Sequence, residues 1–247
     1  MRNIETGKYW DFGWKLCEGC TPVSEGCLNC WSLGMEKRFG GGEVRFMADR
    51  VDRPLKRKKP AIYSVWNDLF HEDLETNNVR ATIDTARQCQ QHTFLALTKR
   101  AWYMQKTMRY LAGTGCPCPE NLWLGVTVEN GNHLDRLEDL RHCPGWHFAS
   151  IEPILGRVEF PNNPADYLNW VIVGCETGPG ARIDENTNKN IDSIVDQCLD
   201  ARLPFWVKAR AEYKNGKWTY THDVPKELRQ YPEELKQESH WMKGGLK

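Results

Sequence analysis

Residues 92–100 read HTFLALTKR: an apolar run, residues 94–97, ends abruptly in Thr98, Lys99 and Arg100. A short, continuous apolar run followed at once by charge is typical of a strand that is buried on both faces of a parallel sheet. The same pattern recurs along the chain, at residues 61–66, 122–128, 146–151, 170–173 and 205–207. Residues 10–16 add a candidate strand before these runs, so the sequence predicts about seven parallel strands.

Helical patterns lie between these runs. Apolar residues recur at helical spacing in residues 79–86, with Thr76 or Asn77 as a candidate N-cap, and residues 31–39 form a short helix that ends before three glycines. Further helices are expected at residues 101–111, around the Leu134, Leu137 and Leu140 stripe, and along Ile191, Ile194, Val195, Cys198 and Leu199. Alternating strands and helices predict an α/β fold, namely a TIM-type or partial (β/α) barrel with parallel strands, or alternatively a doubly wound open sheet.

The chain divides into two expected parts. Residues 1–210 carry the alternating pattern and form the barrel domain. Residues 211–247 are rich in Lys, Glu, Trp and Tyr without clear strand alternation, so we expect a C-terminal extension packed on the barrel.

A polar or charged residue follows each of six strands. These residues are Asp68, Lys99, Glu129, Glu152, Glu176 and Lys208. In both candidate folds active groups lie at the carboxyl ends of parallel strands, so these side chains are candidate site residues. Alternatively, they pair with one another around the mouth of the barrel.

Composition and charge limit the class of protein. Lys+Arg and Asp+Glu both number 33, so no overall field draws the chain to nucleic acid or to a membrane. The N-terminal sequence has no apolar signal core and no later stretch is a membrane span, so we expect a cytoplasmic protein with reduced thiols. Ten cysteines in such a compartment indicate metal binding or catalysis rather than disulfides.

Four of these cysteines lie in residues 17–30, CEGCTPVSEGCLNC, with the spacing C-x2-C-x6-C-x2-C. Two CxxC pairs predict a metal site, either a closed four-thiolate zinc or an iron–sulfur cluster. If only three thiolates bind a [4Fe–4S] cluster, one iron stays open to a cofactor or substrate.

Residues 19–31, GCTPVSEGCLNCW, resemble the signature Gly-Cys-Thr-x-x-Ser-x-Gly-Cys-x-x-Cys-Tyr of a family of phage and bacterial proteins that are similar to radical S-adenosylmethionine (SAM) enzymes. Further blocks follow in the family's order: DRPLKRKKP (52–60), NDLFHEDL (67–74), QHTFLALTKR (91–100), NLWLGVTVEN (121–130), SIEPILGRV (150–158), VIVGCETGPGAR (171–182) and LPFWVKAR (203–210). The chain departs from the pattern at Cys17, which lies outside the motif, at Trp31 in place of Tyr, and at Cys175 in place of Gly.

The resemblance implies a radical SAM barrel in which Cys20, Cys27 and Cys30 hold a [4Fe–4S] cluster, SAM binds the open iron, and a flavodoxin or ferredoxin donates the electron. The activity implied is generation of a 5′-deoxyadenosyl radical that abstracts hydrogen from the substrate. Candidate cofactor-binding residues are Trp31, Asp68, Glu129, Ser150, Glu152 and Arg182. Candidate catalytic or substrate-holding residues are Lys99, Glu176 and Lys208.

The substrate is less directly indicated. The basic segment RPLKRKKP, residues 53–60, suits phosphate contact, and the many aromatic residues suit base stacking. With the family's phage setting, this favours isomerisation of a modified nucleobase, such as a thymine 5-substituent, in DNA or a nucleotide of the host cytoplasm. The alternatives are a DNA photolesion-repair lyase and a non-catalytic, zinc-stabilised nucleic-acid-binding module.

Several other residues remain open. Trp31, Trp66 and Trp206 are candidates to line a pocket, and His71 is either a proton carrier or a loop cap. A second metal centre would draw on five of the six cysteines outside the cluster: Cys89, Cys116, Cys118, Cys143 and Cys175.

Overall fold

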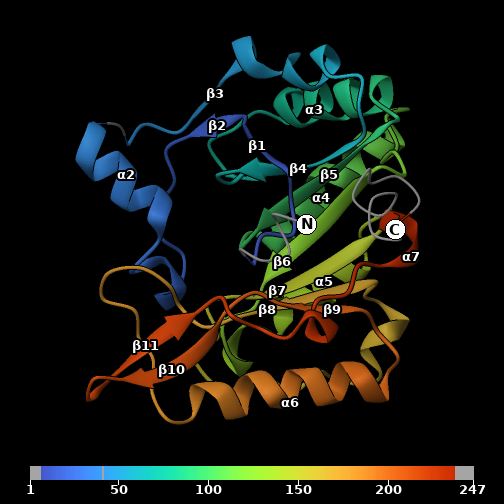
Figure 1. Ribbon diagram of the computed structural model, residues 1–247. Helices are drawn as coiled ribbons and strands as arrows, with labels where there is room; N and C mark the ends of the chain where they lie inside the picture. Colours follow the sequence, from blue (N-terminus) through green and yellow to red (C-terminus); the bar gives the residue numbers. More distant parts are fainter. Residues whose placement is uncertain (1–6, 41, 237–247) are drawn as a thin grey trace.

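The computed structural model describes residues 7–40 and 42–236, and the fold is an α/β half-barrel (Figure 1). Seven strands form one sheet in the order β1-β4-β5-β6-β7-β8-β9, and every neighbouring pair is parallel. The strands are β1 (Phe12–Lys15), β4 (Ala61–Trp66), β5 (His92–Thr98), β6 (Leu122–Thr127), β7 (His147–Ile151), β8 (Trp170–Val173) and β9 (Phe205–Val207). The predicted seven parallel strands are therefore confirmed.

The strand order distinguishes between the two expected folds. A doubly wound sheet reverses its direction at one point, whereas here each new strand is added on the same side of the preceding one. The doubly wound alternative is therefore wrong. Because the edge strands β1 and β9 do not pair with each other, the curled sheet forms an open rather than a closed barrel.

Helices follow most strands. They are α2 (Trp31–Phe39), α3 (Thr76–Gln88), α4 (Ala101–Gly113), α5 (Asp135–Arg141), α6 (Thr187–Asp200) and α7 (Glu233–Lys236). Short 3₁₀ turns are η1 (Glu25–Cys27), η2 (Ala48–Arg50), η3 (Arg53–Lys56), η4 (Gly131–His133), η5 (Pro164–Asp166) and η6 (Lys226–Leu228). The predicted N-cap of α3 is wrong, because Thr76 is already helical and Glu75 caps the helix without a side-chain bond.

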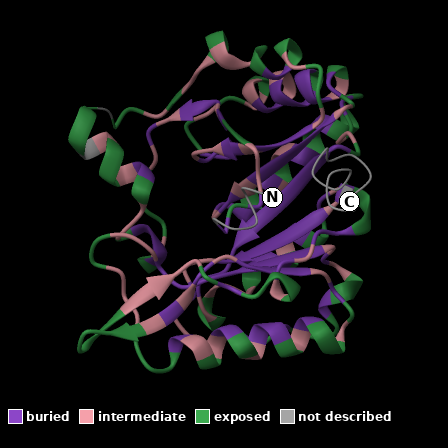
Figure 2. Cartoon of the chain, in the orientation of Figure 1, coloured by how far each residue is buried: buried purple, intermediate pink, exposed green. Residues whose placement is uncertain are grey.

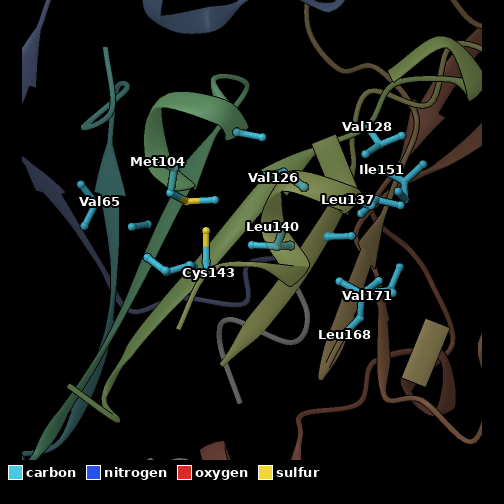
Figure 3. Close-up of a cluster of buried hydrophobic side chains, with 14 of the residues drawn as sticks. Val65, Met104, Val126, Val128, Leu137, Leu140, Cys143, Ile151, Leu168 and Val171 are labelled. Carbon is cyan, nitrogen blue, oxygen red and sulfur yellow. The ribbon is translucent and has the colours of Figure 1, made fainter. Parts of the chain in front are cut away.

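The outer face of the sheet packs against α3 to α6 and forms the main core. Figure 2 shows the sheet strands buried along most of their length, as the apolar runs predicted. Figure 3 shows Met104 of α4 and Leu137 and Leu140 of α5 over Val126 of β6. The predicted stripe of α6 also faces this core, except Leu199, which is exposed.

The inner face of the sheet carries a second, aromatic cluster. Trp123, Phe148, Trp170 and Trp206 project from neighbouring strands and pack with aromatic residues that include Tyr9 and Tyr231. Gly125 makes room for this cluster, since a Cβ atom there would lie 2.3 Å from the Phe148 ring. Trp206 is fully buried and its Nε1 donates to the Gly7 carbonyl at 3.0 Å, so the prediction that it lines a pocket is wrong.

Two small antiparallel sheets flank the half-barrel. One pairs β2 (Cys17–Glu18) with β3 (Arg45–Phe46), and the other is a hairpin of β10 (Arg210–Lys214) and β11 (Lys217–Thr221). Asn188 of α6 bonds both backbone groups of Ala211, which fixes β10 on the barrel. We predicted a C-terminal extension from residue 211 without assigning strands to it, and the structure places this hairpin there.

Residues 237–247 of the expected extension lie outside the described residues. Within the described ranges, none of the helices has the length and apolar character needed to cross a membrane.

Candidate functional site

The cysteine loop, residues 17–30, lies across the carboxyl ends of the strands. It begins in β2, passes through η1 and ends at Cys30, the N-cap of α2. Cys17 faces the main core and is 1% exposed, and burial raises its pKa to about 12. Cys27 is also buried, whereas Cys20 and Cys30 are partly exposed. The three cysteines of the motif therefore differ in environment from Cys17.

Four polar side chains in or just after the loop bind the ends of four strands. Thr21 Oγ1 accepts from Arg100 at 2.6 Å after β5, and Ser24 donates to Glu129 after β6. Asn29 donates to Glu176 at 3.0 Å after β8, and Ser32 donates to Asn67 at 2.8 Å after β4. The polar residues that follow the strands therefore converge on the cysteine loop.

Glu129 is the most deeply buried of these groups. Its carboxylate is 0% exposed and accepts from Lys99 Nζ at 2.7 Å, from Arg136 at 2.8 Å and from Ser24. Burial alone raises the pKa of Glu129, but these cations and the Ser24 hydroxyl outweigh it, so the pKa is lowered. Gly26 lies directly above it, since a Cβ atom there would lie 2.3 Å from Glu129 Oε1.

Arg100 is a second centre of the site that the sequence did not single out. Its guanidinium is nearly buried and pairs with Asp68 at 3.0 Å and with Glu72. It also donates to the Thr21 carbonyl at 3.0 Å, and its Nη1 lies 3.8 Å from Cys20 Sγ. The signal available in sequence was its place directly after Lys99, but burial of the guanidinium could not be read there.

His71 supports the same part of the loop. Its Nε2 lies 2.9 Å from Thr21 Oγ1 and its Nδ1 accepts from the Asp73 backbone at 3.2 Å. Both ring nitrogens are thus occupied by local contacts, as expected of a loop-capping histidine.

Cations lie beside two of the three motif sulfurs. Lys99 Nζ is 3.7 Å from Cys27 Sγ. Burial raises the pKa of Cys27, but backbone hydrogen bonds and Lys99 outweigh this and lower it, whereas burial raises the pKa of Cys20 to about 11. Three thiols, two of them with neighbouring cations, supply the type of donor that an iron–sulfur cluster uses.

The positions of the sulfurs are a separate question from their chemistry. Among residues 7–40 and 42–236, no three His, Cys, Asp or Glu side chains converge in a set able to hold a metal ion. Thiols are the type of donor that a cluster uses, and the loop carries them at the carboxyl ends of the strands. Any ligand set for a cluster would therefore need the three sulfurs to draw together.

The remaining predicted site residues are held in ion pairs or in the sheet. Lys208 pairs with Glu152, and Arg182 pairs with Glu176 through two hydrogen bonds, the shorter at 2.5 Å. Ser150 is buried within β7 and aligned with Thr127 of β6. The expected alternative, pairing of charges around the mouth, thus describes Lys99, Lys208 and Arg182 in this structure.

The basic segment, residues 53–60, lies at the opposite end of the strands from the cysteine loop. His92, the first residue of β5, bonds the Pro54 and Arg57 carbonyls through Nε2, at 3.2 and 3.0 Å. Residues 53–60 therefore adjoin the amino ends of the strands. Phosphate contacts there would not hold a base at the cysteine loop.

The other cysteines do not form a second centre in the described ranges. Cys89, Cys116, Cys143 and Cys175 are buried members of the main core, and Cys118 packs against it. Burial raises the pKa of Cys118, Cys143 and Cys175 to about 12 in each case. These thiols behave as small apolar groups.

Two cavities adjoin the cysteine loop. One, of about 420 Å³, lies between α2, the β2–β3 pair and the ends of β1 and β4, and both Trp31 and Trp66 line it. The other, of about 440 Å³, is more polar and is lined by Glu25, Asn130 and Arg182.

Comparison with known families places the whole region in one match. The family model described as "Protein of unknown function (DUF5131)" matches residues 5–242. The chain belongs to this family. The half-barrel and the cysteine loop both fall within the matched DUF5131 region. No significant match to the chain was found among the curated proteins or the solved structures.

Proposed function

We propose that this protein is a radical SAM enzyme whose half-barrel is the partial barrel of that class, with Cys20, Cys27 and Cys30 as the ligands of a [4Fe–4S] cluster. One observation carries the proposal: partly buried polar contacts from a three-cysteine loop and the residue Ser32 just after it reach the carboxyl ends of four parallel strands. The chemistry supplied by such a cluster with SAM is formation of a 5′-deoxyadenosyl radical that removes hydrogen from a C–H bond.

Two cations lie beside two of the three proposed ligand sulfurs. Lys99 and Arg100 lie 3.7 and 3.8 Å from the sulfurs of Cys27 and Cys20, and positive charge favours thiolate over thiol. Glu129 and Asp68 hold these cations in place. We therefore assign Glu129 and Asp68 as residues that position the loop, rather than as the direct SAM contacts that the sequence suggested.

The less buried pairs are better placed to receive a ligand. Glu152 and Lys208 are 15% and 20% exposed in their side chains, and Arg182 is 32% exposed. Ligand carboxylate or amino groups can exchange with partners in such pairs at lower desolvation cost. We assign Glu152, Lys208 and Arg182 to contacts with SAM or an anionic substrate, and Glu176 to holding Arg182.

The four-thiolate zinc alternative is disfavoured by one contact set. Cys17, the fourth thiol that a closed site would need, packs in the main core and is 1% exposed, whereas Cys20 and Cys30 are partly exposed. The proposed substrate remains a modified nucleobase of DNA, isomerised at a thymine 5-substituent, with flavodoxin or ferredoxin as electron donor in the cytoplasm.

The test is anaerobic reconstitution with iron and sulfide. The brown protein should contain about four irons and four sulfides per chain. With reductant and SAM it should release 5′-deoxyadenosine, and the Cys30→Ala variant should not. Colourless protein that retains one zinc per chain would contradict the proposal. DNA that contains 5-hydroxymethyluracil and DNA that contains photolesions then distinguish a modification enzyme from a repair lyase.

A further inference from the structure

The cavity beneath α2 has the size and the lining of a ligand pocket. Its volume is about 420 Å³, within the usual range for small-molecule sites of roughly 300–1,000 Å³. Helix α2 forms one wall, and Trp66 and Asn67, at the end of β4, form part of the opposite wall. Gly19 and Trp31, which adjoin Cys20 and Cys30, also line it, so the cavity is continuous with the cysteine loop.

The helix that lines this cavity carries an apolar stripe without a core to cover it. Trp31, Met35 and Phe39 recur at a spacing of four residues and are 58%, 50% and 68% exposed. The green surface of α2 in Figure 2 contrasts with the buried strands. The Trp31 and Trp66 rings lie 5.1 Å apart at 69°, an edge-to-face arrangement, and the exposed Trp31 ring offers a face on which a flat ring can stack.

One polar group in the cavity lacks a partner. Glu36 Oε1 is buried and has no hydrogen-bond partner in the described part of the chain. The Ser32 hydroxyl donates to Asn67 Oδ1 at 2.8 Å, so the amide oxygen of Asn67 is engaged and its amide nitrogen is the donor group. An unpaired buried acceptor is costly, so the cavity calls for a ligand that donates to Glu36. Asn67 can donate to an acceptor on the same ligand.

We propose that this cavity binds a nucleobase with a lactam edge, –NH–C(=O)–, stacked on the ring of Trp31 and bordered by Trp66. The ring N–H donates to Glu36 and the ring carbonyl accepts from Asn67. Thymine, uracil and guanine carry this edge. Cytosine and adenine instead carry an amino group in place of the carbonyl and an unprotonated ring nitrogen in place of the N–H. Recognition of an unstacked base by aromatic faces and edge hydrogen bonds is the usual arrangement in enzymes that act on bases.

This inference rests on the proposed function for the identity of the substrate, and it names the part of the site that selects it. A base in this cavity would lie beside the loop that carries Cys20 and Cys30. The binding step requires no cofactor, so it can be measured on protein that contains no cluster and no SAM.

The experiment measures fluorescence anisotropy of labelled single-stranded oligo-dT and oligo-dC of equal length with cofactor-free protein. Oligo-dT should bind about tenfold more tightly than oligo-dC. Trp31→Ala should weaken binding of both by about tenfold, through lost stacking. Tyr110→Ala is the matched control, because Tyr110 is a comparably exposed aromatic residue outside the cavity, at 61%.

Glu36→Ala should remove the preference for oligo-dT, and Glu36→Gln, which keeps the shape of the side chain, should reduce it. The second variant keeps the test valid if the first does not fold by circular dichroism. Equal binding of the two oligonucleotides by the unaltered protein, or an unchanged preference in both Glu36 variants, would overturn the proposal. Competitive displacement of oligo-dT by SAM would do the same, since it would assign the cavity to the cofactor.

The outcome is independent of the test of radical chemistry. Cavity variants without effect, in a protein that binds iron and cleaves SAM, would reject the base pocket alone. A selective pocket in a protein that binds no cluster would instead reject the proposed activity.

Discussion

Nζ of Lys99 lies 2.7 Å from a carboxylate oxygen of Glu129 and 3.7 Å from the sulfur of Cys27. One ammonium group thus connects the end of β5, the end of β6 and the cysteine loop. Because Glu129 is fully buried and also binds Arg136 and Ser24, the local order of the loop depends on this carboxylate.

Glu129→Gln is expected to lower the free energy of unfolding by about 3–5 kcal/mol, since it leaves Lys99 and Arg136 without their buried counter-ion. Urea unfolding followed by circular dichroism measures the change. Glu138→Gln is the control, because its pair with Arg141 is exposed and should change the free energy by less than about 0.5 kcal/mol. Equal effects of the two variants would show that Glu129 does not stabilise the fold.

Gly26→Ala is expected to reduce iron content after reconstitution while the protein remains folded. The added Cβ would lie 2.3 Å from Glu129 Oε1 and push the loop off its support. Gly34→Ala is the control, because a Cβ at this position of α2 meets nothing within 4 Å and alanine favours the helix. Iron and sulfide assays compare the two; full loading of Gly26→Ala would mean that the loop does not need its contact with Glu129.

Cys17→Ala is expected to retain iron, whereas alanine at Cys20, Cys27 or Cys30 should abolish loading. The reason is the position of Cys17 in the main core, where it is 1% exposed. Colorimetric iron assays and absorption near the visible charge-transfer bands measure the difference. Loss of metal in Cys17→Ala, with the fold intact, would restore the four-thiolate alternative.

The stability of the protein should fall as the pH drops below the ordinary pKa of a glutamate, in part through Glu176. Burial raises the pKa of Glu176, but hydrogen bonds from Arg182 and Asn29 outweigh this and lower it. A carboxylate with a lowered pKa stabilises the fold above its unfolded pKa of about 4.3, and this contribution is lost as the pH falls through the folded value.

Glu176→Gln should therefore flatten the pH dependence of the unfolding free energy on the acid side of about pH 4.3. Urea unfolding at a series of pH values compares the variant with the unaltered protein. Parallel pH profiles would show that the pair of Glu176 with Arg182 does not stabilise the folded state.

Neutralising the basic segment should leave base selection intact. The triple variant Lys56→Gln, Lys58→Gln and Lys59→Gln removes charge near the amino ends of the strands, at the opposite edge from the cysteine loop. The ratio of oligo-dT to oligo-dC affinity should not change when measured by anisotropy. A reduced ratio would place the base near residues 53–60 after all.

Most of the fold was predictable because its strands are buried on both faces. Continuous apolar runs then mark each strand, and the helices that cover the outer face carry ordinary amphipathic stripes. The hairpin of β10 and β11 was missed although apolar and polar residues alternate in both strands, with Ala211 and Tyr213 in the first and Trp218 and Tyr220 in the second. Its turn, Asn215–Gly216, has positive φ values of 53° and 78° and was a readable hairpin signal.

The site was predictable only in outline. Charged residues after the strands correctly indicated the carboxyl ends of the strands as the place of the site. Four of them do converge near the loop: Asp68, Lys99, Glu129 and Glu176. The contacts that fasten the loop could not be read, because Thr21, Ser24 and Asn29 are ordinary loop residues until their partners are known. The place of the basic segment was likewise hidden, since local sequence does not state which edge of a sheet a loop joins.

The fastening of the cysteine loop to four strands has a consequence for local motion. A segment with so little regular structure would ordinarily open by itself, and its amide protons would exchange with solvent within a short time. Here Thr21, Ser24, Asn29 and Ser32 each bond the end of a different strand, so the segment can lift only when several partly buried contacts break together. We therefore expect the loop and the carboxyl ends of the strands to open as one cooperative unit, so that amide protons exchange slowly in the loop as well as in the strands.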